Sequence, residues 1–74
     1  MRYFIFKNRR NGKLVLDTDF SCHPPRQILC HYEHETPLIV TESTLEADIK
    51  FRNISTKTYN VVEIMLVDVK GVVL

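Results

Sequence analysis

Tryptophan is absent from this sequence, and glycine and cysteine are scarce, with two residues each. The two glycines, Gly12 and Gly71, cannot form a glycine-rich phosphate-binding loop. No stretch approaches the roughly 20 apolar residues that a membrane-spanning helix needs. The apolar run near the N-terminus is short and is followed by charged residues, so it lacks the pattern of a signal peptide. These absences predict a cytoplasmic protein without a membrane partner, in which both cysteines stay thiols.

The chain of 74 residues is long enough for a single domain, which we place at residues 1–74. Apolar residues make up 45% of the chain, which is sufficient to build a core. A domain of this size nevertheless buries only about 60% of its unfolded surface, so its core supplies little stability. A partner chain or a cross-link would supply the rest.

Charge is unevenly distributed along the chain, although the formal net charge is only +1. From Asp17 to Asp48, seven acidic residues accompany a single base, Arg26. The region before Asp17 has no acidic residue and five bases, namely Arg2, Lys7, Arg9, Arg10 and Lys13. The sequence therefore predicts surfaces of opposite charge.

Three segments have the pattern of β-strands. The first is RYFIFK, and it is followed by the turn sequence Asn11-Gly12 and by KLVLD, which together predict a β-hairpin with a loop of about five residues. The segment TYNVVEIMLVDV, residues 58–69, is apolar on both faces and predicts a strand in the interior of a sheet. A turn over 68–71 and a last short strand, VVL, would follow.

Residues 24–34 fit a short helix. Pro24 and Pro25 suit the first turn of a helix, where no N–H bond is needed. Four residues then share one helical face: Pro25, Ile28, Leu29 and Tyr32. A strand would instead align Ile28, Cys30, Tyr32 and His34. We favour the helix, followed by a short strand at LIVT, residues 38–41.

Residues 44–54 fit either a helix or a strand. Apolar and charged residues alternate over 45–52, which is a strand pattern. Against this, Ser43 and Glu46 have the spacing of a capping box, and acidic residues precede basic ones, as in a helix. We favour a helix, in which one face would carry Ala47, Phe51 and Ile54 and another Leu45 and Ile49.

The predicted order is ββαβαβ, which is an α+β fold with a small, mainly antiparallel sheet and one or two short helices. A small all-β barrel or sandwich is the alternative if 44–54 is a strand. Two short helices cover one face of the sheet only, so we expect a second copy of the chain, in a homodimer, to cover the other.

Both cysteines and all three histidines lie in SCHPPRQILCHYEHE, residues 21–35. Zinc requires about four such ligands. In a helix over 24–34, Cys30 and His34 would lie one turn apart, and Cys22 or His23 would have to close the site. The spacing matches no familiar zinc motif, so a small zinc-binding domain, with Cys22, Cys30 and His34 as its candidate ligands, is an alternative only.

Catalytic residues are not apparent in the sequence. A nucleophilic cysteine needs a positioned base, an orienting group and a pocket. A domain this small seldom has a pocket of several hundred cubic ångströms. We therefore predict that the protein is not an enzyme and uses no cofactor.

The first loop is strongly basic, and its charged residues are the candidate binding residues for a partner or a nucleic acid: Lys7, Arg9, Arg10 and Lys13. Asn8 and Asn11 beside them could add hydrogen bonds to phosphates. Aromatic residues are missing from the loop, and charge there also keeps strand edges from aggregating.

These observations favour a small non-enzymatic protein-binding regulator or inhibitor, with another protein as its partner. Stand-alone proteins of this size and simplicity, including those of phages and mobile elements, often have such roles, although this step rests on analogy. A nucleic-acid-binding module that uses the basic loop is the alternative function.

Overall fold

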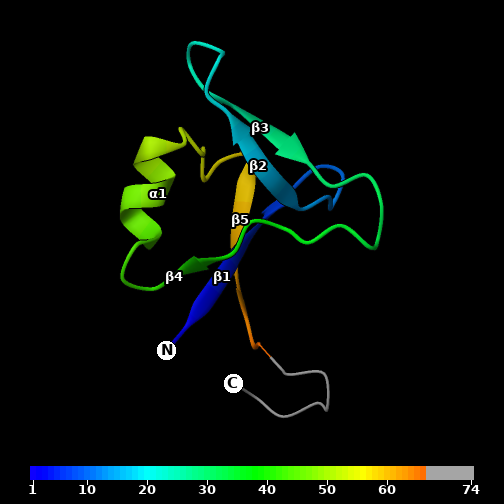
Figure 1. Ribbon diagram of the computed structural model, residues 1–74, viewed down its shortest axis with the longest axis vertical. Helices are drawn as coiled ribbons and strands as arrows, with labels where there is room; N and C mark the ends of the chain where they lie inside the picture. Colours follow the sequence, from blue (N-terminus) through cyan, green and yellow to red (C-terminus); the bar gives the residue numbers. More distant parts are fainter. Residues whose placement is uncertain (67–74) are drawn as a thin grey trace.

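The structure is a computed structural model, and it describes residues 1–66. Its elements follow the chain as β1 (Tyr3–Asn8), β2 (Val15–Asp19), β3 (Arg26–Leu29), β4 (Val40–Thr41), α1 (Leu45–Phe51) and β5 (Tyr59–Ile64). The strands form antiparallel pairs in two sheets, with one short helix beside them, and the sheets do not close into a barrel (Figure 1). The predicted α+β class is therefore confirmed. The predicted turn over 68–71 and the strand VVL lie outside the described residues.

Strand β1 is the centre of a three-stranded sheet with the order β4-β1-β5. It pairs with β5 along its whole length, from Tyr3 opposite Ile64 to Asn8 opposite Tyr59. Its residues Phe4 to Phe6 are all buried, as expected for a central strand with two apolar faces. In the part of the chain that the structure describes, β5 is an edge strand, so the interior position predicted for it is not seen there.

The core lies between β1, β2, β4 and the segment after α1. It consists of Phe4, Phe6, Val15, Val40 and Ile54, and Leu45 and Ile49 of α1 pack against it. Phe6 and Val15 are its two fully buried large side chains among residues 1–66. Burial of one such side chain stabilises the fold by about 1.5–3 kcal/mol, so this small cluster is the main source of stability.

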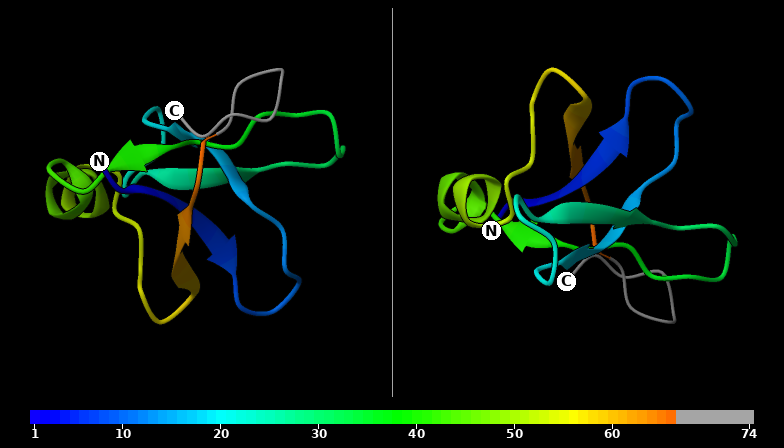
Figure 2. Two further views of the ribbon diagram at one scale, coloured as in Figure 1. Left: turned by 90° about the horizontal axis from the view of Figure 1, so that it is seen from below. Right: turned by 90° about the horizontal axis from the view of Figure 1, so that it is seen from above.

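The predicted hairpin between β1 and β2 forms at its turn only. Lys7 and Leu14 make one bridge, and the Asn8 N–H donates to the Lys13 carbonyl over 2.8 Å. Beyond this point β2 leaves β1 and pairs with β3 in a second, two-stranded sheet that runs in a different direction (Figure 2). The reason is that a strand has two edges, and the edges of β1 are occupied by β5 and, at Tyr3 and Phe4, by β4.

The helix predicted for residues 24–34 is wrong, because residues 26–29 form β3. Here the hydrogen bonds available at the edge of β2 outweigh the helical pattern, and β3 pairs with β2 from Asp19 opposite Arg26 to Val15 opposite Leu29. The side chain of Asp19 accepts hydrogen bonds from the backbone and hydroxyl of Ser21, which stabilises the turn between the two strands.

The helix predicted for residues 44–54 is confirmed as α1, although its details differ. Thr44 is the N-cap residue and makes no side-chain capping bond, so the expected capping box does not form. The core face carries Leu45 and Ile49, while Phe51 is exposed. Asn53 ends the helical region with a positive φ of 54°, a conformation that asparagine tolerates. Among the described residues, no helix has the length and hydrophobicity needed to cross a membrane.

Candidate functional site

A cluster of exposed cations lies where β1 ends and β5 begins. The loop between β1 and β2 carries the four residues singled out from the sequence, and the connection from α1 to β5 adds Lys57. We call this cluster the basic end, and it consists of Lys7, Arg9, Arg10, Lys13 and Lys57, all of them exposed. The two connections project from the same end of the β1–β5 pair (Figure 2). The antiparallel pairing of Asn8 with Tyr59 places them there.

The two connections are held together by Arg9. Its backbone N–H donates to the Thr58 carbonyl over 2.9 Å. Its guanidinium Nε and one Nη donate to the Thr56 carbonyl over 3.2 and 2.9 Å. Because these acceptors are neutral, Arg9 joins the loops while its positive charge is kept.

The loop between β1 and β2 is ordered by its own asparagines. The side-chain oxygen of Asn8 accepts from the backbone N–H groups of Arg10 and Asn11, and that of Asn11 accepts from the Lys13 N–H. Gly12 has a φ of 72°, which glycine adopts without a steric cost, and its N–H donates to the Asn8 carbonyl. These side-chain oxygens therefore organise the loop, and the added hydrogen bonds from Asn8 and Asn11 to phosphates stay a prediction.

The three candidate zinc ligands are not brought together. Cys22 lies before β3, and Cys30 and His34 lie after it, so an extended strand separates them. No three His, Cys, Asp or Glu side chains in residues 1–66 are grouped so that they could hold one metal ion. The Cys22 thiol donates to an Asp19 carboxylate oxygen over 3.5 Å, and the His34 ring stacks on Tyr32 with a centroid distance of 5.5 Å.

An open cavity of about 250 Å³ lies between the basic loop and the segment after β3. Its lining includes Lys13, Cys30 and Glu35. One Glu35 oxygen accepts from the backbone N–H groups of His31 and Tyr32, both over 2.8 Å, and these bonds lower the pKa of Glu35. Burial, and to a lesser extent the nearby Glu35 charge, raises the pKa of Cys30. This thiol is therefore poorly suited to act as a nucleophile, because the thiolate is the reactive form.

An aromatic surface, which sequence reasoning missed, is formed by Phe20 and Phe51. Their ring centroids are 4.9 Å apart, and the two residues are 42% and 70% exposed. Phe20 lies in the turn after β2, and Phe51 ends α1. The guanidinium of Arg52 lies 5.8 Å from the centre of the Phe20 ring. The available signal was that Phe51 falls on a different helical face from Leu45 and Ile49.

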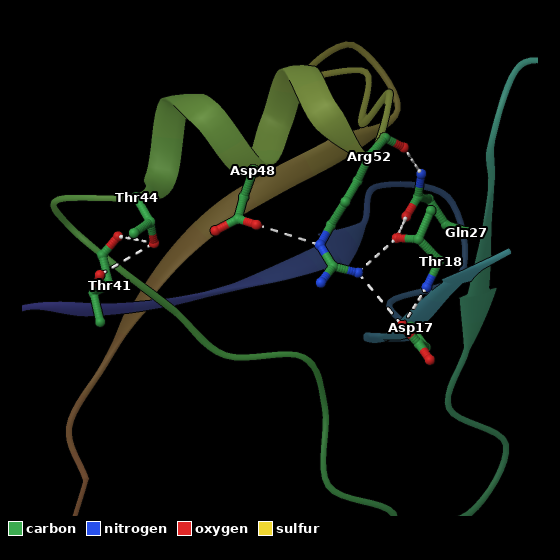
Figure 3. Close-up of polar contacts among 7 residues, drawn as sticks. All are labelled: Asp17, Thr18, Gln27, Thr41, Thr44, Asp48 and Arg52. Carbon is green, nitrogen blue, oxygen red and sulfur yellow. Dashed lines mark hydrogen bonds and ion pairs between the residues drawn. The ribbon is translucent and has the colours of Figure 1, made fainter. Parts of the chain in front are cut away.

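Arg52 also contacts residues of α1, β2 and β3, as Figure 3 shows. It forms ion pairs of 3.4 Å with Asp17 and with Asp48, and it donates to the Thr18 hydroxyl over 3.1 Å. The Gln27 amide in turn donates to the Arg52 carbonyl. At the opposite end of α1, Thr41 and Thr44 bond each other over 3.1 Å. The charge of Arg52 is thus balanced internally, unlike the charges of the basic end.

The fold and its surfaces define a small α+β protein with an aromatic surface and a separate basic end. No protein-family model matches this chain, and neither a curated protein nor a solved structure matches it. The chemistry of the two surfaces is therefore the basis for a functional proposal.

Proposed function

We propose that this chain is a small non-enzymatic protein-binding regulator that contacts its partner through the aromatic surface. The observation that carries the proposal is the exposed contact between Phe20 and Phe51, which leaves much of both rings in water. Full burial of a phenylalanine side chain is worth about 1.5–3 kcal/mol, so a partner that covers both rings would gain substantial binding energy. Aromatic residues and arginine are also the residue types enriched where binding energy concentrates.

The chemistry of this surface indicates the kind of partner. Because Asp17 and Asp48 balance Arg52, the surface offers apolar area and little net charge. It fits an apolar, largely uncharged patch on another protein better than it fits a polyanion. The ion pairs and the bond to Thr18 hold the Arg52 guanidinium beside the Phe20 ring, which limits the entropy that Arg52 loses on binding.

A non-catalytic role is supported by the cysteines. The raised pKa of Cys30 and the separation of Cys22 from Cys30 both disfavour covalent chemistry. Both thiols are free, which suits the reducing cytosol, the location that we propose. The proposed partners also include a second copy of the chain, which would bind along β5.

The experiment is a comparison of three purified proteins as baits: the unmodified chain, Phe51→Ser and Tyr32→Ser. Tyr32 is 66% exposed and lies outside the aromatic surface, so its variant is the matched control. Captured proteins are identified by mass spectrometry, produced in pure form and titrated by calorimetry. We expect a partner that binds the unmodified chain and Tyr32→Ser alike and binds Phe51→Ser at least about tenfold more weakly, the equivalent of about 1.4 kcal/mol. A purified partner that binds Phe51→Ser as tightly as the unmodified chain would refute the proposed surface.

A further inference from the structure

The basic end concentrates positive charge to a degree that the net charge conceals. It contains five of the ten Lys and Arg residues and no carboxylate. The remainder of the chain has five Lys and Arg against nine Asp and Glu, which is a formal charge of −4, although the whole chain carries +1. Folding adds Lys57 to a group that in the sequence comprises residues 7–13.

These cations are not engaged by carboxylates of the described residues. Within residues 1–66, the ion pairs involve Arg2, which binds Glu42 and Glu63, and Arg52, which binds Asp17 and Asp48. Within residues 1–66, Arg2 and Arg52 are thus paired with carboxylates, whereas the five cations of the basic end are not. Fixed, exposed and unneutralised charges of one sign attract a partner of the opposite sign.

The arrangement of the charges indicates an extended ligand. The cations come from two adjacent connections, and each is exposed instead of converging in an enclosed pocket. A single phosphate group would be served by a compact pocket, whereas charges spread over two loops suit a polymer with a repeating negative charge. The asparagine bonds and the contact between Arg9 and Thr56 hold the loops in place before binding, so little additional order is required.

We propose that the basic end binds the phosphate backbone of a nucleic acid, without selecting a base sequence. The loops carry positive charge and hydrogen-bond donors but no exposed aromatic ring for base stacking among residues 7–13 and 55–58. This activity is separate from the proposed contact of the aromatic surface with a protein, and neither depends on the other.

The test is fluorescence anisotropy with labelled oligonucleotides of about 20 nucleotides, as single-stranded DNA, duplex DNA and single-stranded RNA, between about 50 and 200 mM salt. If all five cations contact phosphates of duplex DNA, the logarithm of the affinity falls with a slope of about −4.5, equivalent to a loss of at most about 500-fold over this range. Two mixed sequences of equal length should bind alike. The tightest of the three oligonucleotides identifies the form of nucleic acid.

The deciding variant is Arg10→Ala with Lys57→Ala, which takes one cation from each connection and leaves Arg9 to join them. We expect the salt dependence to become shallower by about two units, from a slope of about −4.5 to about −2.7. The affinity for duplex DNA then falls only about 40-fold over the same salt range. The matched control is Arg26→Ala with Lys50→Ala, which removes the same charge from exposed positions elsewhere and should leave the slope unchanged. The variant Arg10→Lys with Lys57→Arg exchanges the two cations and keeps the charge, so it should keep the slope of the unmodified chain. Circular dichroism verifies that all variants are folded.

Three results would overturn the proposal. The first is the absence of binding at the lowest salt concentration. The second is a salt dependence that becomes as shallow in the Arg26→Ala with Lys50→Ala control as in the Arg10→Ala with Lys57→Ala variant, which would show that net charge alone matters. The third is equally tight and equally variant-sensitive binding of a polyglutamate peptide, which would assign the basic end to an acidic protein.

Discussion

Arg52 and Asp17, 35 residues apart in the sequence, form an ion pair of 3.4 Å that joins the end of α1 to β2. Asp17 is well exposed, with 65% of its side chain accessible, whereas the side chain of Arg52 is only 18% accessible. The partly buried partners of Arg52 are Asp48, at 3.4 Å, and the hydroxyl of Thr18, which is a buried residue. The contacts of one arginine thus connect the helix to the second sheet, but they differ in how well water shields them.

Removal of Arg52 should destabilise the fold. The substitution Arg52→Met keeps much of the aliphatic chain but leaves Asp48 and Thr18 without this donor. We expect a loss of about 1–3 kcal/mol in the free energy of unfolding, because hydrogen bonds to a charged group are lost and the partly buried Asp48 carboxylate loses its cation. Urea denaturation followed by circular dichroism measures it.

The control for this prediction is Asp17→Asn, which removes only the exposed ion pair. Exposed pairs contribute about 0–1 kcal/mol, so its effect should be the smaller of the two. Equal destabilisation by Arg52→Met and Asp17→Asn would mean that the pair with Asp17 is the main contribution of Arg52.

The ion pair between Arg2 and Glu63 should make stability depend on pH in the acidic range. Arg2 donates to both oxygens of Glu63, over 2.8 and 3.2 Å, and this hydrogen bonding lowers the pKa of Glu63 below the ordinary 4.5. A lowered pKa in the folded state gives a stabilisation that is fully present above the unfolded value and is lost as the pH falls through the folded value. The melting temperature of Glu63→Gln should therefore lie below that of the unmodified chain at neutral pH, and the two should converge as the pH falls from the ordinary value through the lowered, folded-state pKa.

A suitable control for the pH experiment is Glu33→Gln. Glu33 is exposed and makes no hydrogen bond or ion pair with the side chains of residues 1–66. The melting temperature of Glu33→Gln should differ from that of the unmodified chain by an amount that does not shrink at acidic pH, unlike the difference expected for Glu63→Gln. A difference for Glu63→Gln that stays constant from neutral to acidic pH would contradict a lowered pKa at this site.

Cys30 should be a slow nucleophile in the folded protein. Burial and the charge of Glu35 raise its pKa, so less thiolate is present at a given pH. In a Cys22→Ser background, alkylation by iodoacetamide should reach its half-maximal rate at a higher pH in the folded chain than in urea. Glu35→Gln should move that midpoint downward. A folded midpoint below the unfolded one would instead indicate an activated thiol and would weaken the case against catalysis.

The sequence predicted those elements whose signal is local. The apolar run of β1 and the acidic-to-basic order of α1 are properties of consecutive residues, and both were interpreted correctly. The segment 26–29 was not, because its strand depends on the edge offered by β2, which no pattern within the segment reports. Pairing between strands distant in the sequence can override a local helical pattern in this way.

The binding surfaces were predictable to different extents. The charges of residues 7–13 are visible in the sequence as a cluster. Lys57 joins them only because β1 and β5 are antiparallel, and Phe20 meets Phe51 only because the turn after β2 lies beside the end of α1. Residues contributed by distant segments become a surface through the topology, so spacing along the chain does not reveal them.

The remaining prediction concerns self-association through β5. Val61 of β5 is 37% exposed and Met65, directly after the strand, is 72% exposed, whereas Ile64 is half-buried. Within residues 1–66, β5 is also an edge of its sheet. A twofold-related copy placed antiparallel along this edge would cover the exposed apolar side chains of both chains with a single self-complementary contact.

We therefore expect the chain to be a homodimer by light scattering at high micromolar concentration, and we expect two lysine substitutions to act differently. Met65→Lys should give a folded monomer with nearly the original melting temperature, because a charge at an exposed position disrupts only the contact with the second copy. Ile64→Lys should lower the melting temperature, because it forces a charge into a half-buried position. An unmodified chain that is monomeric at this concentration would exclude the second copy and leave a different protein as the proposed partner. A Met65→Lys variant that remains dimeric would move the interface away from β5.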